Sequence, residues 1–168
     1  IALLVLSADQ ASKAWTVENI ALNTTVPIIP DFDWFVLTHI TNSGAAFGLF
    51  PQAGIVFTLI AVIVSFAIVA YYRSLPTGQW LVRLSLGLQL GGAIGNLIDR
   101  VRYGSVVDMF YLRYWPVFNV ADSAIVCGVA LLMLHLLRNP SAPALVPVST
   151  AAAENIQTPR DGIGEPQP

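Results

Sequence analysis

The chain has 168 residues, of which 55% are hydrophobic and only 11% are charged. A typical soluble domain carries about 25% charged residues, so this composition favours a membrane protein. A net charge of −2 provides no basic surface for nucleic acid, and a single cysteine, Cys127, excludes an internal disulfide and a cysteine-based metal cluster.

The N-terminal part of the chain predicts a first membrane span over about residues 1–15. The run Ile1–Leu6 is apolar and leads directly into Asp9 and Lys13. The chain starts with Ile and not Met, and we expect this run to be the end of a longer apolar helix. Asp9 and Lys13 are four residues apart and share one face of a helix. They form either an ion pair at the membrane interface or part of a functional site.

A mixed segment over about residues 30–50 is too polar and too broken by prolines to cross a bilayer. Within it, Trp34–Thr41 is rich in aromatic and β-branched residues and predicts a strand. A turn signal follows at Asn42–Gly44. Together with about residues 104–116, this segment predicts a small extramembrane β-containing subdomain with aromatic residues at the membrane interface.

Three further spans are expected, over about residues 54–72, 80–98 and 117–137. Residues 54–72 carry no charge, and at ~1.5 Å per residue they cover roughly 28 Å, close to the ~30 Å hydrocarbon core. The last span must begin near Phe118, because a helix from Ser123 to Leu137 would cover only about 22 Å. Asp122 is therefore expected about one turn inside this helix.

Two other features of the C-terminal part follow from composition. Cys127 lies deep in the last span, where we expect a small core residue. Residues 139–168 are rich in Pro, Ala and Ser without a periodic apolar face, which predicts a disordered tail outside the membrane domain of residues 1–138.

The third span carries two distinct faces. Polar and small residues recur at spacings of four, three, four and three, which places them on one stripe of a helix: Ser85, Gln89, Gly92, Asn96 and Asp99. An adjoining face has a glycine at every fourth position, at Gly87, Gly91 and Gly95. Such a pattern lets another helix approach closely.

Ionisable residues inside a membrane are expensive and are functional candidates by default. Short connections between four spans place Asp99, Asp108 and Asp122 on one side of the membrane, and 13 residues separate the last two, enough for them to meet. Two carboxylates in a low-dielectric site share one proton. Such a pair can hydrolyse an amide, one taking a proton from water and the other donating to the leaving nitrogen. Asn119 can orient a carboxylate or bind a developing oxyanion.

Two alternatives remain open on these residues alone. The aspartates can form a transport or proton path, or pair structurally with Arg100 and Arg102. A transporter is disfavoured because the sequence shows no pair of broken helices. His39 and His135 are expected near opposite membrane faces, so a histidine-based triad is not indicated, and counting basic residues gives no orientation.

Five sequence blocks closely resemble bacterial lipoprotein signal peptidase, also called signal peptidase II. They occur in the family's order, and together they are far more specific than any one alone. The blocks are Asp9–Lys13, Thr41–Gly48, Gly91–Arg100, Gly104–Asp108 and Phe118–Ser123.

The resemblance implies a mainly α integral membrane protein with four transmembrane helices and a small extracytoplasmic β-cradle. It implies an aspartic endopeptidase of the bacterial inner membrane, with its active site on the extracytoplasmic side. The enzyme removes signal peptides from prolipoproteins that carry a lipobox, cleaving just before a cysteine already modified with diacylglycerol. It is expected to need no cofactor or metal, to act as a monomer among membrane lipids, and to be inhibited by globomycin.

Carried over motif by motif, the resemblance makes Asp108 and Asp122 the catalytic pair. The positions that match the family's site-supporting residues are Asp9, Lys13, Asn42, Gly92, Asn96, Asp99, Arg100, Asn119 and Ala121. Interfacial aromatics at Trp34, Phe35 and Phe47 are expected to hold the lipid-modified end of a substrate. Met109 departs from the family pattern, which usually has Phe directly after the first catalytic aspartate.

Overall fold

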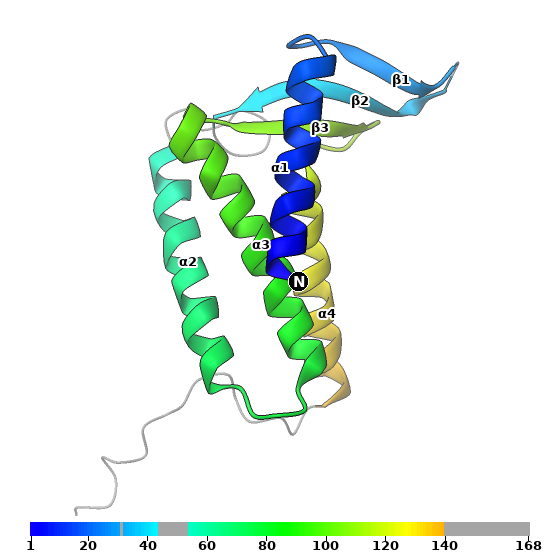
Figure 1. Cartoon of the computed structure of the whole chain (residues 1–168). Coiled ribbons are helices and arrows are strands. Elements are labelled where there is room, and N and C mark those ends of the chain that lie inside the picture. The colour runs from blue at the N-terminus through cyan, green and yellow to red at the C-terminus, as the bar shows by residue number, and fades with distance from the viewer. Residues whose placement is uncertain (31, 44–53, 140–168) are drawn as a thin grey trace, which may run out of the picture.

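The computed structural model describes residues 1–30, 32–43 and 54–139. Over these ranges the helices stand side by side as a bundle, and a small sheet lies across one end of it (Figure 1). The expected tail and Phe47 lie outside the described residues. The elements in chain order are α1 (Ala2–Asn19), β1 (Thr25–Ile29), β2 (Phe32–Asn42), α2 (Gly54–Ser74), α3 (Trp80–Tyr103), β3 (Val106–Leu112) and α4 (Val120–Arg138).

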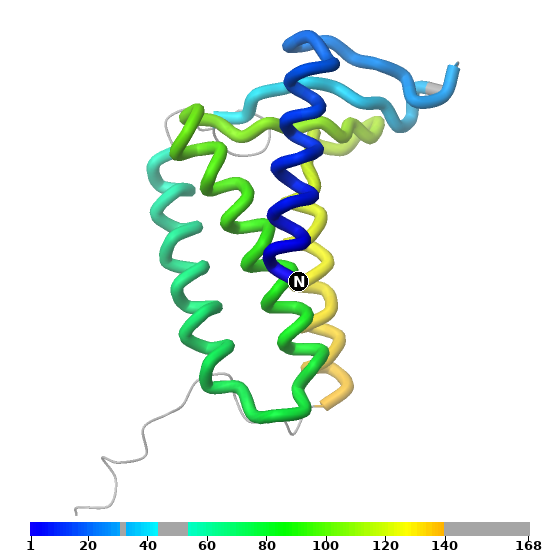
Figure 2. The backbone as a smooth tube through the Cα atoms, viewed as in Figure 1, coloured from blue at the N-terminus to red at the C-terminus, as the bar shows by residue number. Residues whose placement is uncertain are grey.

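Three of the described helices, α2, α3 and α4, are long and apolar enough to cross a membrane. In α2 only Ile68 is fully buried, so most of the helix surface is available to lipid. The span expected first in the chain, over about residues 1–15, corresponds to α1. This helix begins beside Gly87 of α3 and runs past the sheet (Figure 2). It carries Asp9 and Lys13, and it is not among the helices that are long and apolar enough to cross a membrane.

Helix α3 lies at the centre of the bundle and contacts the other three helices. A Cβ atom at Gly91 would lie 2.7 Å from both the Ala2 carbonyl oxygen and the Val5 Cβ of α1. A Cβ atom at the neighbouring Gly92 would overlap the carbonyl of Ala121 on α4. The glycine pattern is therefore confirmed as a close-packing device toward α1, and Gly92, which belongs to the polar stripe, allows a second close approach by α4.

Cys127 is not a core residue, because its side chain is exposed. The buried residues of α4 are Ala121, Ala124 and Gly128, which recur at helical spacing. A Cβ atom at Gly128 would lie 2.7 Å from the carbonyl of Ser85 on α3. This stripe of small residues faces α3, and Cys127 falls outside it, on the surface available to lipid.

The sheet is antiparallel in the order β1-β2-β3. The predicted strand Trp34–Thr41 lies within β2, and the second predicted segment contains β3. No strand was expected at β1, whose Pro27 is tolerated because β1 is an edge strand. The pairing of β2 with β3 brings Asn42 opposite Val106 and Ile40 opposite Asp108, so two of the predicted site residues become neighbours.

The substitution Gly91→Ala tests the contact between α1 and α3. Its added methyl group meets backbone and Cβ atoms that cannot rotate away, so we expect the free energy of unfolding to fall by about 1–3 kcal/mol. Thermal unfolding in detergent measures this loss. Ala70→Val, at an exposed position of α2, is the control, and equal stability of the two variants would contradict the close packing.

Candidate active site

Asp122 is positioned by the first turn of α4. Asn119 is the N-cap of this helix, and its side-chain oxygen accepts a hydrogen bond from the Asp122 backbone N–H at 2.9 Å. The Asp122 carboxylate in turn accepts from the Asn119 backbone N–H at 3.3 Å, which completes a capping box. The helix begins at Val120, two residues later than expected, because Asn119 ends the preceding extended segment. Asp122 is therefore the third residue of the helix, within its first turn, and not about one turn inside it as expected.

Asp108 lies on β3 and is buried, with 3% of its surface exposed. One carboxylate oxygen accepts from the Asn119 side chain at 2.7 Å, and the other accepts from Asn42 at 3.1 Å. Since Asn119 also caps the helix that carries Asp122, a single asparagine contacts both aspartates. The expectation that the connection folds back is confirmed.

The return of the chain from β3 to α4 is secured by Phe110 and Phe118. Each backbone N–H donates to the other's carbonyl, at 2.8 and 3.0 Å, and the two rings pack with their centroids 5.5 Å apart. This bridge places the start of α4 against β3 and so holds Asn119 beside Asp108.

The pKa of the Asp108 carboxyl is raised from 3.8 to about 7, and burial is the largest cause. The nearby Asp122 carboxylate contributes to this rise, while hydrogen bonds from Asn42 and Asn119 and the charge of Lys13 oppose it. The balance leaves Asp108 able to hold or release a proton near neutral pH. A carboxyl group poised in this way suits acid–base chemistry.

Lys13 forms a buried ion cluster with two carboxylates. Its ammonium nitrogen lies 2.9 Å from Asp9 and 2.8 Å from Asp99. Asp9 also accepts from the backbone N–H of Ala121 at 2.9 Å, and Asp99 from that of Val107 at 3.2 Å. Asp9 and Lys13 do form an ion pair, but it is not the interfacial pair that was one of the two alternatives, because it is buried inside the protein and joins α1, α3, β3 and α4.

Asn96 connects the ion cluster to Asp122. Its side-chain oxygen accepts from Lys13 at 2.9 Å and from the Asn119 amide at 3.1 Å. Its own amide nitrogen donates to the Asp122 carboxylate at 2.8 Å. The third N–H of Lys13 is thus used as well, so the ammonium has no proton left for an external ligand.

Three further expected residues lie close to this network. Arg100 interacts electrostatically with the carboxylates of Asp99, Asp108 and Asp122. Its guanidinium lies 5.8 Å from the ring centroid of Phe57. Gly92 and Ala121 act through packing, since the close contact between their backbones sets the approach of α3 to α4.

Gln10 and Thr16 were not assigned a role from sequence, and Gly95 was expected only to let another helix approach. A Cβ atom at Gly95 would overlap the Asp9 carboxylate. Gln10 donates to Asp99 at 3.0 Å, and Thr16 donates to the sulfur of Met109 at 3.5 Å, on the buried side of β3. Gly95 and Gln10 lie inside the blocks quoted above, but only the packing of α1 against α3 and β3 reveals what they contact.

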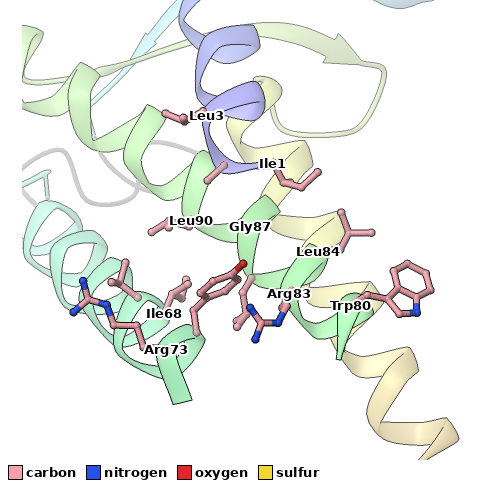
Figure 3. Close-up of a pocket in the computed structure, with 13 residues that line it drawn as sticks. Ile1, Leu3, Ile68, Arg73, Trp80, Arg83, Leu84, Gly87 and Leu90 are labelled. Carbon is pink, nitrogen blue, oxygen red and sulfur yellow. The ribbon is translucent and has the colours of Figure 1, made fainter. Parts of the chain in front are cut away.

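A cavity of about 610 Å³ near the opposite end of the bundle is unrelated to the aspartates (Figure 3). It is bordered by the start of α1, the end of α2 and the first half of α3. The charged residues among the described ones that line it are Arg73 and Arg83. No group of three or more His, Cys, Asp or Glu residues in the described ranges is arranged as a metal site.

Comparison with known proteins gives a family for this geometry. The family described as Signal peptidase (SPase) II matches residues 1–138. The chain belongs to the signal peptidase II family. As a member of this family the chain is a peptidase. The family consists of membrane enzymes, which agrees with the three apolar helices long enough to cross a membrane.

Individual relatives agree with this family. The chain is 53% identical over 137 residues to "Lipoprotein signal peptidase" of Moorella thermoacetica, covering 82% of this chain and 90% of that protein. It is 47% identical over 137 residues to the protein of the same name from Halothermothrix orenii, covering 81% and 92%. Among solved structures it resembles a bacterial membrane enzyme determined by the in meso method at 2.3 Å resolution, with TM-score 0.76 and 30% identity over 83% of this chain and 87% of that one.

The raised pKa of Asp108 predicts a pH-dependent stability. The folded protein binds this proton more tightly than the unfolded chain, so the wild-type free energy of unfolding falls as pH rises from about 4 to about 7. Asp108→Asn removes this dependence. We expect the stability of the variant relative to wild type to rise by up to about 4 kcal/mol between pH 4 and pH 8. Thermal melts at both pH values measure it, and the same trend in Asp33→Asn, at an exposed position of β2, would contradict the assignment.

Lys13→Met tests the ion cluster. It leaves two buried carboxylates without their cation, and we expect a loss of roughly 3–5 kcal/mol in the free energy of unfolding. Arg138→Met, which removes an exposed cation from the last turn of α4, is the matched control. Similar melting temperatures for the two variants in detergent would show that the cluster is not a stabilising centre.

Proposed function

We propose that this chain is an aspartic endopeptidase that removes signal peptides from diacylglyceryl-modified bacterial prolipoproteins, cleaving just before the lipidated cysteine. The observation that carries the proposal is the meeting of Asp108 and Asp122 around Asn119, with a proton held by Asp108 near neutral pH. The names of the relatives supply the substrate class.

In this mechanism the Asp122 carboxylate accepts a proton from a water molecule, whose oxygen attacks the scissile carbonyl carbon. Asp108, which holds the pair's single proton, donates it to the cysteine nitrogen as the C–N bond breaks. The proton taken from water then remains in the pair, which restores its starting charge. The Asn96 amide donates a hydrogen bond to the Asp122 carboxylate at 2.8 Å and so orients it.

Asn119 is proposed to orient the aspartates, and not to bind the oxyanion. Its amide nitrogen already donates to Asp108 at 2.7 Å and lies 3.1 Å from the Asn96 oxygen. An amide has two N–H donors, so neither remains for a developing oxyanion. The partly exposed Arg100, which interacts with both aspartates, is better suited to stabilise negative charge in the transition state.

We further propose that α1 is a fourth membrane span and that the sheet and aspartates face the extracytoplasmic side of the bacterial inner membrane. The charged residues of α1 that would oppose insertion are buried against α3 and α4, since Asp9 and Lys13 are at most 3% exposed. The exposed Trp34 of β2 is suited to contact the lipid-modified end of the substrate. Inhibition by globomycin and action as a monomer belong to the same proposal.

The substitutions Asp108→Asn and Asp122→Asn test the catalytic pair. Each removes one member of the acid–base couple, and we expect a loss of cleavage of about 10³-fold or more. The measurement is cleavage of a diacylglyceryl-modified lipobox peptide by the purified protein in detergent, with and without globomycin. Asp33→Asn is the matched control, because it removes an exposed carboxylate from the same sheet.

The same variants separate this function from its alternatives. Full cleavage by either variant would disprove the catalytic pair. An ion flux into liposomes that depends on Asp122, without proteolysis, would instead indicate a transport path. Failure of both variants to fold would indicate a purely structural pairing, whereas folded and inactive variants support the proposal.

A further inference from the structure

We propose that a second pocket, between α1 and the end of α3, binds the headgroup of a zwitterionic phospholipid of the phosphatidylethanolamine class. This pocket, called here the rear pocket, has a volume of about 640 Å³ and is lined by residues of α1, β2, α3 and β3. Neither Asp108 nor Asp122 lines it, so it is separate from the aspartate pair. Among its lining residues are Val17, Glu18, Leu22, Arg102, Tyr103 and Ser105.

Two charges of the rear pocket have opposite sign and come from different helices. Glu18 lies in the last turn of α1 and Arg102 in the last turn of α3. Both are exposed, and neither forms an ion pair within the described residues, not even with the other. Among the described residues, the pocket therefore carries an unpaired acid and an unpaired base that are too far apart to form an ion pair with one another.

The other charges that line the rear pocket are already satisfied. Lys13 and Asp99 pair with each other at 2.8 Å, and the remaining protons of Lys13 are directed at Asp9 and Asn96. The ligand must therefore complement Glu18 and Arg102. A simple anion would meet Glu18 and a simple cation would meet Arg102. A ligand with both a phosphate and an ammonium group complements the two together.

The position of the rear pocket favours a lipid as the source of this zwitterion. Arg102 and Tyr103 end the membrane-spanning helix α3, which places the pocket mouth at headgroup level. Tyr103 is exposed there, as is typical of an aromatic residue at a membrane interface. The exposed Val17 and Leu22 extend the pocket with apolar surface that suits the glycerol backbone and upper acyl chain.

Hydrogen-bonding groups in the pocket favour a primary ammonium group, which has N–H donors, over a quaternary ammonium group, which has none. Ser105 and Thr41 contribute hydroxyl groups to the pocket lining, which can donate to a phosphate, and the Glu18 carboxylate can accept N–H bonds. A choline headgroup has no N–H to donate, and a glycerol headgroup has no positive charge. Phosphatidylethanolamine is therefore expected to bind better than phosphatidylcholine or phosphatidylglycerol.

The experiment measures the melting temperature of the full chain in nanodiscs of phosphatidylcholine to which a second lipid is added at one fixed mole fraction. We expect phosphatidylethanolamine to raise the melting temperature by about 4 °C relative to phosphatidylglycerol. Arg102→Gln should abolish this difference. Glu18→Gln should also abolish it, by allowing phosphatidylglycerol to stabilise the protein as well as phosphatidylethanolamine does.

The control is Arg138→Gln, which removes an exposed arginine at the other end of the bundle and should keep the wild-type preference. Equal stabilisation of the wild type by both lipids would overturn the proposal, as would an unchanged preference in Arg102→Gln and Glu18→Gln. Soluble glycerophosphoethanolamine tests the source. If it alone produces the full shift in phosphatidylcholine nanodiscs, the site binds a free zwitterion and the lipid assignment is wrong. Because the readout is stability, this result is independent of the proposed peptidase activity.

Discussion

The ammonium group of Lys13 is the contact on which the rest of the site depends. A buried charge is tolerated only when opposite charges and hydrogen bonds surround it, and Lys13 meets this requirement with two carboxylates and one amide oxygen. Each carboxylate then accepts a backbone N–H from another element, Asp9 from the start of α4 and Asp99 from β3. The positive charge thus holds together the two elements that carry the proposed reactive aspartates.

The two asparagines transmit this arrangement to the aspartates. The Asn96 oxygen must face Lys13, so its nitrogen must face Asp122. The Asn119 oxygen must face the first turn of α4, so its nitrogen must face Asp108. Each aspartate therefore receives a donor whose direction is set elsewhere in the fold. Such preorganised donors need no rearrangement during a reaction.

Close helix packing is what allows so many polar groups to meet inside a membrane protein. At Gly92 and Gly95 of α3, a side chain would occupy the space now taken by the Ala121 backbone and the Asp9 carboxylate. The absence of side chains at these positions lets α1 and α4 approach until direct hydrogen bonds form between them and α3. The sheet closes the same end of the bundle and contributes Asn42 and Asp108, while the opposite end, where α2 and α3 connect, carries none of this network (Figure 1).

The sequence by itself determined the membrane class, the helical segments, the strand around Trp34–Thr41 and the residues of the candidate site, because hydrophobic periodicity and short polar motifs are local signals. It did not reveal the edge strand β1, which depends on pairing with β2, nor the outward position of Cys127, which depends on which face of α4 meets α3. Only the tertiary structure decided that Lys13 binds Asp99 as well as Asp9, and that Asn119 contacts both aspartates. These contacts join residues far apart in the chain, and their partners are selected by packing and by the need to satisfy buried charge, which no local pattern encodes.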